Sequence, residues 1–230
     1  MFKSAWSHLN KDFHHIPSGV KLLGLVIFLR TMGWGFADPF FSLYLKQFSS
    51  DYALIGMLSS VTALTALLAI IPLMRLTDKV KESTLIFDGE ALYLAVIFSY
   101  LFAGLTGSMF MLLFALALNG VAQTFVVVGA ETYIRQHDNH GKSGPFGFYV
   151  AMDYLGWILG MLIAAYTVHL YNLNSMFLFI LPSIILSFVI LPRIRERGIS
   201  SLLTGIKRYL HTRQDFADLF RDFRSFNPRM

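Results

Sequence analysis

Residues 53–74 read ALIGMLSSVTALTALLAIIPLM, and none of these side chains is charged. A helix needs roughly 20 predominantly apolar residues to cross the hydrocarbon core of a bilayer, and this segment is long enough. A backbone inside lipid cannot bond to water, so a spanning segment must satisfy its own amides and carbonyls, as a helix does. The segment therefore predicts a transmembrane helix.

Five further apolar segments of similar length accompany this one along the chain. The six predicted spans are residues 19–45, 53–74, 84–106, 109–134, 145–170 and 174–192. Only 14% of the 230 residues are charged, whereas an ordinary soluble domain has about 25%. We therefore predict an all-α membrane protein with six transmembrane helices, in which short connections make neighbouring helices antiparallel.

Lysine and arginine are unevenly distributed between the two sides of these spans. They occur before the first span, between the second and third, between the fourth and fifth, and nine times after the sixth. The opposite side has only Lys46. Because positive residues collect on the cytoplasmic side, we predict a multi-pass protein of the cytoplasmic (inner) membrane with both termini in the cytoplasm.

Both ends of the chain have segments that are not predicted to span. Residues 1–18 are predicted to form a cytoplasmic interfacial segment, since apolar side chains recur there at helical spacing before Pro17. Residues 193–230 are predicted to be a basic cytoplasmic linker or tail, whose apolar stripe is typical of an amphipathic helix on an anionic leaflet. A nucleic-acid patch is the weaker alternative, so we predict the lipid bilayer as partner and no nucleic acid.

The six-helix domain, residues 19–192, divides into two groups of three spans. Residues 19–106 and 109–192 are related by an offset of about 90 residues, and the second and fifth spans open alike, with Ile55-Gly56 and Phe146-Gly147. Because each unit has three helices, the second unit enters the membrane from the opposite side. This spacing predicts an inverted 3+3 repeat, a common architecture of secondary transporters.

Two charged residues lie inside the first span. Arg30 and Asp38 are eight residues apart, about two helical turns, and so lie on broadly the same side of the helix. Trp34 lies between them, flanked by two glycines, and Pro39 permits a bend. A charge near the bilayer centre costs at least about 2.5 kcal/mol, so it usually faces a cavity or a partner. We predict that this segment lines a substrate or proton pathway; a structural ion pair with a neighbouring helix is the alternative.

Polar residues in the fourth and fifth spans extend the predicted pathway. Asp153 lies well inside the fifth span, next to Tyr154 and close to Trp157. A carboxyl at that depth can hold a proton or a cationic group, or can form a structural pair with the arginine of the first span. Asn119 and Gln123 give the fourth span a polar stripe, which suits solute contact and interhelical bonding equally.

Other acidic residues lie nearer the predicted cytoplasmic surface. Glu131 and Arg135 are four residues apart at the inner end of the fourth span, a spacing that stabilises a helix, and we predict a structural or gating role. Asp88 and Glu90 of the third span are expected to be hydrated, because they lie close to the inner surface.

The connection between the second and third spans contains a recognisable motif. Residues 74–81 read MRLTDKVK and are similar to the loop G-x-x-x-D-(R/K)-x-G-(R/K)-(R/K) of the major facilitator superfamily. The aspartate and the following lysine are present, and Met74 and Lys81 replace the two glycines.

The fifth span adds a second likeness. Gly147, Gly156 and Gly160 reproduce the G-x8-G-x3-G spacing of helix 5 in that family, where the glycines pack helices closely. Met161 stands where antiporters of the family often have proline, which favours a symporter, and Leu116 stands at the place of the arginine usual in helix 4. Over residues 18–230 the chain resembles the N-terminal half of a major facilitator transporter.

The resemblance implies a secondary transporter of a small solute, in which two six-helix halves rock around a central site by alternating access. Asp78, Lys79 and Lys81 then belong to a cytoplasmic gate, and the charged residues of the first and fifth spans face the cavity. Proton coupling through Asp38 or Asp153 is a further hypothesis. Because six helices form only one wall of such a cavity, we expect half of a twelve-helix protein, with pairing of two copies as the alternative.

Two other classes of protein remain open. A six-helix intramembrane enzyme would need a catalytic motif, and no Gly-x-Ser or His-Glu-x-x-His pattern lies within the predicted spans. A membrane scaffold without transport activity has no such requirement. The chain has no cysteine, and isolated His137 and His140 make a poor metal site. We therefore predict no enzyme activity, no cofactor and no metal.

Overall fold

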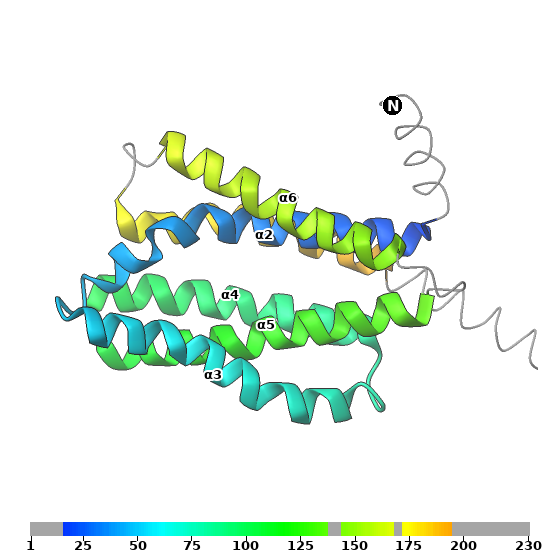
Figure 1. Cartoon of the computed structure of the whole chain (residues 1–230), viewed down its shortest axis with the longest axis horizontal. Helices are drawn as coiled ribbons and strands as arrows, with labels where there is room; N and C mark the ends of the chain where they lie inside the picture. Colours follow the sequence, from blue (N-terminus) through cyan, green and yellow to red (C-terminus); the bar gives the residue numbers. More distant parts are fainter. Residues whose placement is uncertain (1–15, 138–143, 168–171, 195–230) are drawn as a thin grey trace, which may run out of the picture. The chain divides into compact units, whose positions relative to one another are not determined.

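A computed structural model describes residues 16–137, 144–167 and 172–194 (Figure 1). Within them, six helices are long and apolar enough to cross a membrane, which confirms the predicted all-α fold with six spans. The spans are α2 (Ser18–Leu45), α3 (Tyr52–Leu76), α4 (Glu82–Thr106), α5 (Met109–His137), α6 (Gly144–Thr167) and a last span, Leu173–Ile194, which begins with the 3₁₀ helix η2 (Leu173–Phe179). Most of the predicted interfacial segment and nearly all of the basic tail lie outside the described residues, and the inverted repeat stays a prediction.

Local sequence explains where several helices begin and end. The carboxylate of Asp51 accepts a hydrogen bond of 2.8 Å from the backbone amide of Ala53 and so caps the start of α3. Gly107 follows α4 with a φ of 65°, in the left-handed region that favours glycine, and its amide donates to the carbonyl of Ala103 at 2.8 Å. Only Gly107 and Ser108 therefore separate α4 from α5.

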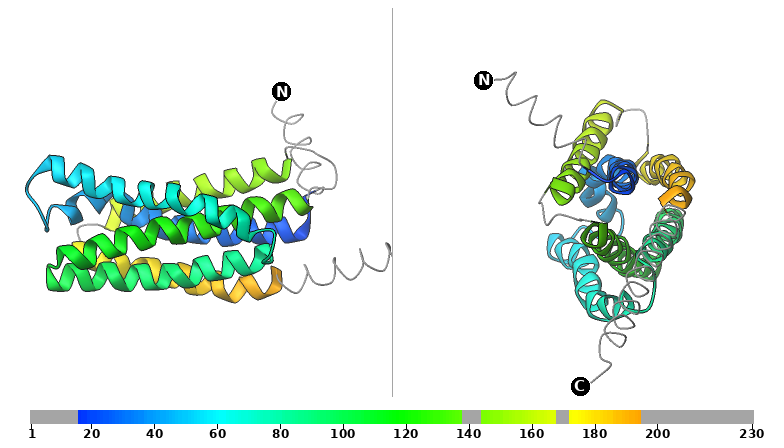
Figure 2. Two further views of the ribbon diagram at one scale, coloured as in Figure 1. Left: turned by 90° about the horizontal axis from the view of Figure 1, so that it is seen from below. Right: turned by 90° about the vertical axis from the view of Figure 1, so that its right-hand side faces the viewer.

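The helices pack as two groups, visible along the bundle in Figure 2. In one group α2 lies against α6, and in the other α3 and α4 lie against α5. The last span contacts both groups, through η2 on α2 and on α4. Few contacts join α2 directly to α3 or α5. Side chains from both groups can therefore line the space between them.

Small residues bring α2 and α6 into backbone contact. A side chain at Gly156 would meet the carbonyl of Phe28 and the hydroxyl of Thr31, and one at Gly160 would meet the carbonyl of Met32. The Thr31 hydroxyl also donates to the backbone carbonyl of Asp153 at 2.9 Å. Small residues allow this approach in membranes, where close packing and interhelical hydrogen bonds hold helices together.

Gly147, the remaining glycine of the predicted packing motif, has different surroundings. Gly147 is exposed, and a Cβ placed on it would meet nothing within 4 Å. Among the described residues Gly147 therefore makes no close helix contact, and its role in helix packing stays a prediction. Its side of α6 lies away from α2, because it is nine residues, two and a half turns, before Gly156.

Aromatic side chains join the last span to both groups at the end where α4 stops. The Tyr44 hydroxyl of α2 donates to the backbone carbonyl of Tyr100 in α4 at 2.6 Å. Phe177 of η2 stacks on Tyr100 with ring centroids 4.8 Å apart and meets the Tyr44 ring edge-on at 4.9 Å. All three side chains are fully buried, so this cluster fixes α2, α4 and η2 relative to one another.

We expect Gly156→Ala to lower the free energy of unfolding by roughly 1–3 kcal/mol, because the added methyl group meets backbone of α2. The measurement is the unfolding midpoint of the purified protein in mild detergent against increasing denaturing detergent. Gly147→Ala is the matched control on the same helix and is expected to be neutral, since its methyl group enters open space. Equal destabilisation by both variants would contradict the packing described for α6.

Candidate functional site

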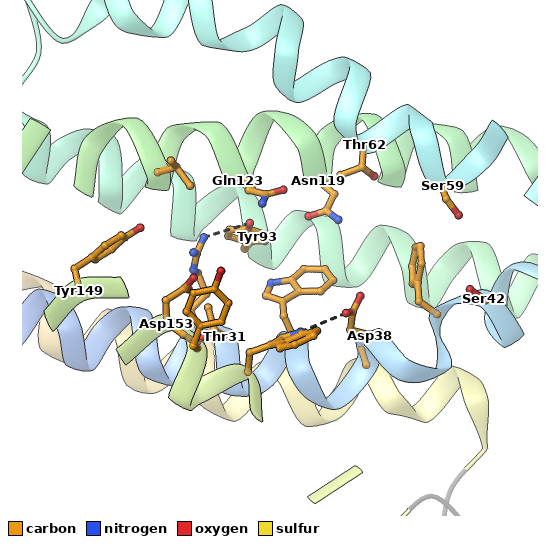
Figure 3. Close-up of a pocket in the computed structure, with 17 residues that line it drawn as sticks. Thr31, Asp38, Ser42, Ser59, Thr62, Tyr93, Asn119, Gln123, Tyr149 and Asp153 are labelled. Carbon is orange, nitrogen blue, oxygen red and sulfur yellow. Dashed lines mark hydrogen bonds between the residues drawn. The ribbon is translucent and has the colours of Figure 1, made fainter. Parts of the chain in front are cut away.

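A cavity of about 640 Å³ lies between the two groups of helices (Figure 3). Side chains from α2, α3, α4, α5 and α6 line it. Its volume falls in the range of about 300–1,000 Å³ that is typical of small-molecule sites. The cavity therefore has the size and the position of a solute-binding site between helices.

All eight residues predicted to form the pathway line this one cavity. They are Arg30, Trp34 and Asp38 of α2, Asn119 and Gln123 of α5, and Asp153, Tyr154 and Trp157 of α6. Figure 3 shows Asp38 and Asp153 on one side of this space and Asn119 and Gln123 on the other. The structure thus brings the predicted residues together, and their role as a pathway for substrate or protons stays a prediction.

Arg30 reaches across the cavity from α2 toward α4. One guanidinium nitrogen donates to the Tyr93 hydroxyl at 3.4 Å, and the guanidinium carbon lies 5.5 Å from the centre of the Tyr93 ring, within cation–π range. Arg30 is only 5% exposed. Between described residues the structure shows no ion pair of Arg30 with Asp38 or Asp153, so the structural pair considered from sequence is not formed.

The two aspartates occupy different settings. The indole nitrogen of Trp157 donates to a carboxylate oxygen of Asp38 at 3.3 Å, which joins α6 to α2 across the cavity wall (Figure 3). Asp153 is half-buried, and its backbone carbonyl accepts from Thr31 while its side chain lines the cavity. Both carboxylates therefore line the cavity without an ion-pair partner among the described residues.

The polar stripe of α5 serves two purposes. The Asn119 amide donates to the Tyr100 hydroxyl at 3.4 Å, so it links α5 to α4 as well as lining the cavity. Gln123 lines the cavity one turn further on. Thr62 of α3 lines it too, and its hydroxyl donates to the backbone carbonyl of Leu116 at 3.1 Å. The stripe therefore forms an interhelical bond and also lines the cavity, and its contact with a solute stays a prediction.

Sequence reasoning missed Glu90, Tyr93 and Tyr149. The expectation that Glu90 is hydrated is wrong: its side chain is 0% exposed, and neither carboxylate oxygen has a hydrogen-bond partner among the described residues. Asp88, two positions earlier, is exposed. Glu90 lies about 12 Å along α4 from Glu82, the first residue of the helix. The depth of Glu90 within α4 and its spacing of three residues from Tyr93 are the sequence features that could have indicated its burial.

The predicted gate residues lie at one end of the bundle. Asp78, Lys79 and Lys81 are exposed in the connection between α3 and α4. Arg135 and Glu131 near the end of α5 form an ion pair of 3.8 Å, with side chains 82% and 39% exposed. Exposed pairs of this kind contribute little to stability, typically under about 1 kcal/mol. The pair forms as the spacing predicts, and a gating role for these five residues stays a prediction.

A charged, membrane-impermeant thiosulfonate is expected to label Gln123→Cys several-fold faster than Leu67→Cys in this naturally cysteine-free chain. Gln123 lines the cavity, where water can support a thiolate, whereas Leu67 is 65% exposed on the apolar outer face of α3 and does not line the cavity. The measurement is the labelling rate by mass spectrometry in intact membranes and after permeabilisation. Equal rates at both positions would contradict a water-filled cavity.

Comparison with known proteins places these features in a family. The model of the Major Facilitator Superfamily matches residues 23–226 of the chain. The match covers α2 to the last span and most of the segment beyond it. No curated protein compared with the sequence matches it.

Proposed function

The chain belongs to the Major Facilitator Superfamily, and on this basis we propose that it is a secondary active transporter that moves a small solute across the cytoplasmic membrane by alternating access. The family is one of transporters rather than enzymes. The proposed orientation, with both termini in the cytoplasm, follows from the distribution of lysine and arginine.

The observation that carries the proposal is the charged cavity between the two groups of helices. Arg30 lies near the middle of α2, and Asp38 and Asp153 line the same cavity. Ionisable residues at that depth are expensive unless they serve a pathway or a partner. A cation and two carboxylates beside Trp34 and Trp157 suit a solute with both polar and apolar parts, and a zwitterion best matches the mixed charge.

Alternating access requires a second six-helix unit, which we propose packs on the faces of α3 and α6. These are the two least buried spans. Gly56 of α3 and Gly147 of α6, which are equivalent in the proposed inverted repeat, both have open space around them. Small residues are enriched where membrane helices meet. The second unit is either a C-terminal half or another copy of this chain.

The pairing of helices supports the inverted repeat behind this assembly. In the proposed repeat α2 corresponds to α5, and α3 to α6. The contact of α2 with α6 then corresponds to that of α5 with α3, and both are extensive. The gate residues, Asp78 to Lys81 and the pair Glu131–Arg135, lie at the proposed cytoplasmic end, where they would meet the second unit.

The first test identifies the solute. We expect one class in a panel of amino acids, betaines, sugars and organic cations to raise the unfolding temperature of the full-length protein, because a ligand that binds only the folded state stabilises it. The same solute should accumulate in proteoliposomes under an imposed pH gradient. Arg30→Gln should abolish binding and uptake, and Asp38→Asn should abolish the uptake that the pH gradient drives. Altered assembly in these variants without any solute flux would instead indicate a scaffold.

Proton coupling through the cavity carboxylates is tested in the same vesicles. Asp38→Asn or Asp153→Asn should leave exchange of solute but remove its dependence on the pH gradient. Uptake that stays gradient-dependent in both variants would exclude these two residues as coupling sites.

The second unit is tested by native mass spectrometry of the protein released from its membrane in polymer nanodiscs. We expect particles that contain two six-helix units. Gly147→Trp should weaken or destabilise them, and Leu105→Trp on the exposed face of α4 should not. Particles with a single 26.1 kDa unit and no effect of Gly147→Trp would contradict the proposed interface.

A further inference from the structure

Three side chains near Tyr93 have buried polar atoms that lack a hydrogen-bond partner among the described residues. They are Nε of Arg30, Nε1 of Trp34 and both carboxylate oxygens of Glu90. The first two atoms are donors and the last two are acceptors. Buried polar groups in proteins are almost always hydrogen-bonded, so a cluster with both kinds of unused group points to a polar occupant.

The four side chains form one cluster that connects α2 to α4. The Arg30 guanidinium and the Trp34 ring each lie 5.5 Å from the Tyr93 ring centre. Glu90 precedes Tyr93 by three residues, so both face the same side of α4. Among the described residues, the titratable groups that act electrostatically on Glu90 are Arg30 from α2 and Tyr93 from its own helix.

Two carboxylates, Glu90 and Asp153, act electrostatically on Arg30. Asp153 lines the cavity with Arg30, and Glu90 does not. No direct ion pair joins Glu90 to Arg30. Glu90 is therefore a buried carboxylate that acts on Arg30 without lining the cavity and without the direct contact that a purely structural pair would make.

Arg30, Trp34 and Tyr93 line the cavity, whereas Glu90, one turn from Tyr93 on α4, does not. A water molecule held by their donors could reach the Glu90 carboxylate, since a buried water typically makes two to four hydrogen bonds to such groups. These three side chains therefore provide a polar route from the cavity to Glu90.

We propose that Glu90 is a proton-binding site of the transporter, loaded from the cavity through the cluster of Arg30, Trp34 and Tyr93. A hydronium ion in the cavity gives its proton to a Glu90 oxygen, which forms an O–H bond and leaves water; the reverse step releases the proton. A neutral Glu90 no longer compensates Arg30, whose charge then becomes available to an anionic group of the solute. The inference rests on the proposed transport function and adds a coupling site outside the cavity.

The alternative is a permanent counter-charge to Arg30, and infrared difference spectroscopy separates the two. The full-length protein in lipid nanodiscs, without solute, is titrated with acid while the carboxylic-acid C=O band is recorded. We expect a band from a water-shielded acid that appears on acidification, persists in Asp38→Asn and Asp153→Asn, and is lost in Glu90→Gln. Arg30→Gln should change the pH at which it appears.

Glu90→Asp is the second variant, in case Glu90→Gln does not fold. It keeps the acid but shortens the side chain, so the band should move in frequency. A titrating band that is unchanged in Glu90→Gln or Glu90→Asp, or a wild-type protein without such a band, overturns the inference.

The measurement is independent of solute transport, so the two proposals can fail separately. A band assigned to Glu90 in a protein that transports none of the solutes contradicts the transport function alone. Gradient-driven uptake that persists in Glu90→Gln contradicts the coupling role alone.

Discussion

The absence of hydrogen-bonding solvent in the bilayer core is the constraint on which this structure depends. It makes every spanning segment a helix and leaves each polar side chain to find a protein partner or a cavity. Thr31 donates to a carbonyl of α6, Thr62 to one of α5, and Tyr44 to one of α4. The same constraint gathers Arg30, Asp38 and Asp153 around one space between the helices. The interhelical hydrogen bonds and the candidate site therefore both result from the absence of water in the bilayer core.

Close approach of α2 and α6 determines the geometry of that space. Gly156 and Gly160 let the backbones meet, which places Trp157 within hydrogen-bonding distance of Asp38. On the other side, the Thr62 hydroxyl of α3 donates to a backbone carbonyl of α5, and the Thr124 hydroxyl of α5 donates to a backbone carbonyl of α3. These two bonds hold the polar stripe of α5 toward the cavity. The charged residues belong to the α2–α6 wall, while the opposite wall offers amides, hydroxyls and Tyr93. A solute between them would meet charge on one side and neutral donors and acceptors on the other.

The sequence predicts the helices and the cavity residues well because both follow from the free-energy cost of exposing polar groups to lipid. That cost applies to each residue separately. Arg30 and Asp153 are costly in any arrangement, so their inward placement can be inferred without knowing the neighbours. Glu90 and Gly147 could not be inferred in this way. Whether Glu90 reaches water depends on the covering residues of α2, and whether Gly147 is packed depends on which side of α6 meets α2. Spacing along one helix does not contain that information.

The turn at Gly107 has a mechanical consequence. Only two residues connect α4 to α5, so the adjoining ends of these helices cannot separate, and Glu90, Tyr93, Asn119 and Gln123 all lie on this helix pair. Arg30 lies on α2, in the other group of helices, and its bond to Tyr93 joins the two groups. A change of charge on the α4–α5 pair would therefore act on the other group through Arg30, while the bond of Tyr44 to Tyr100 holds the two groups together.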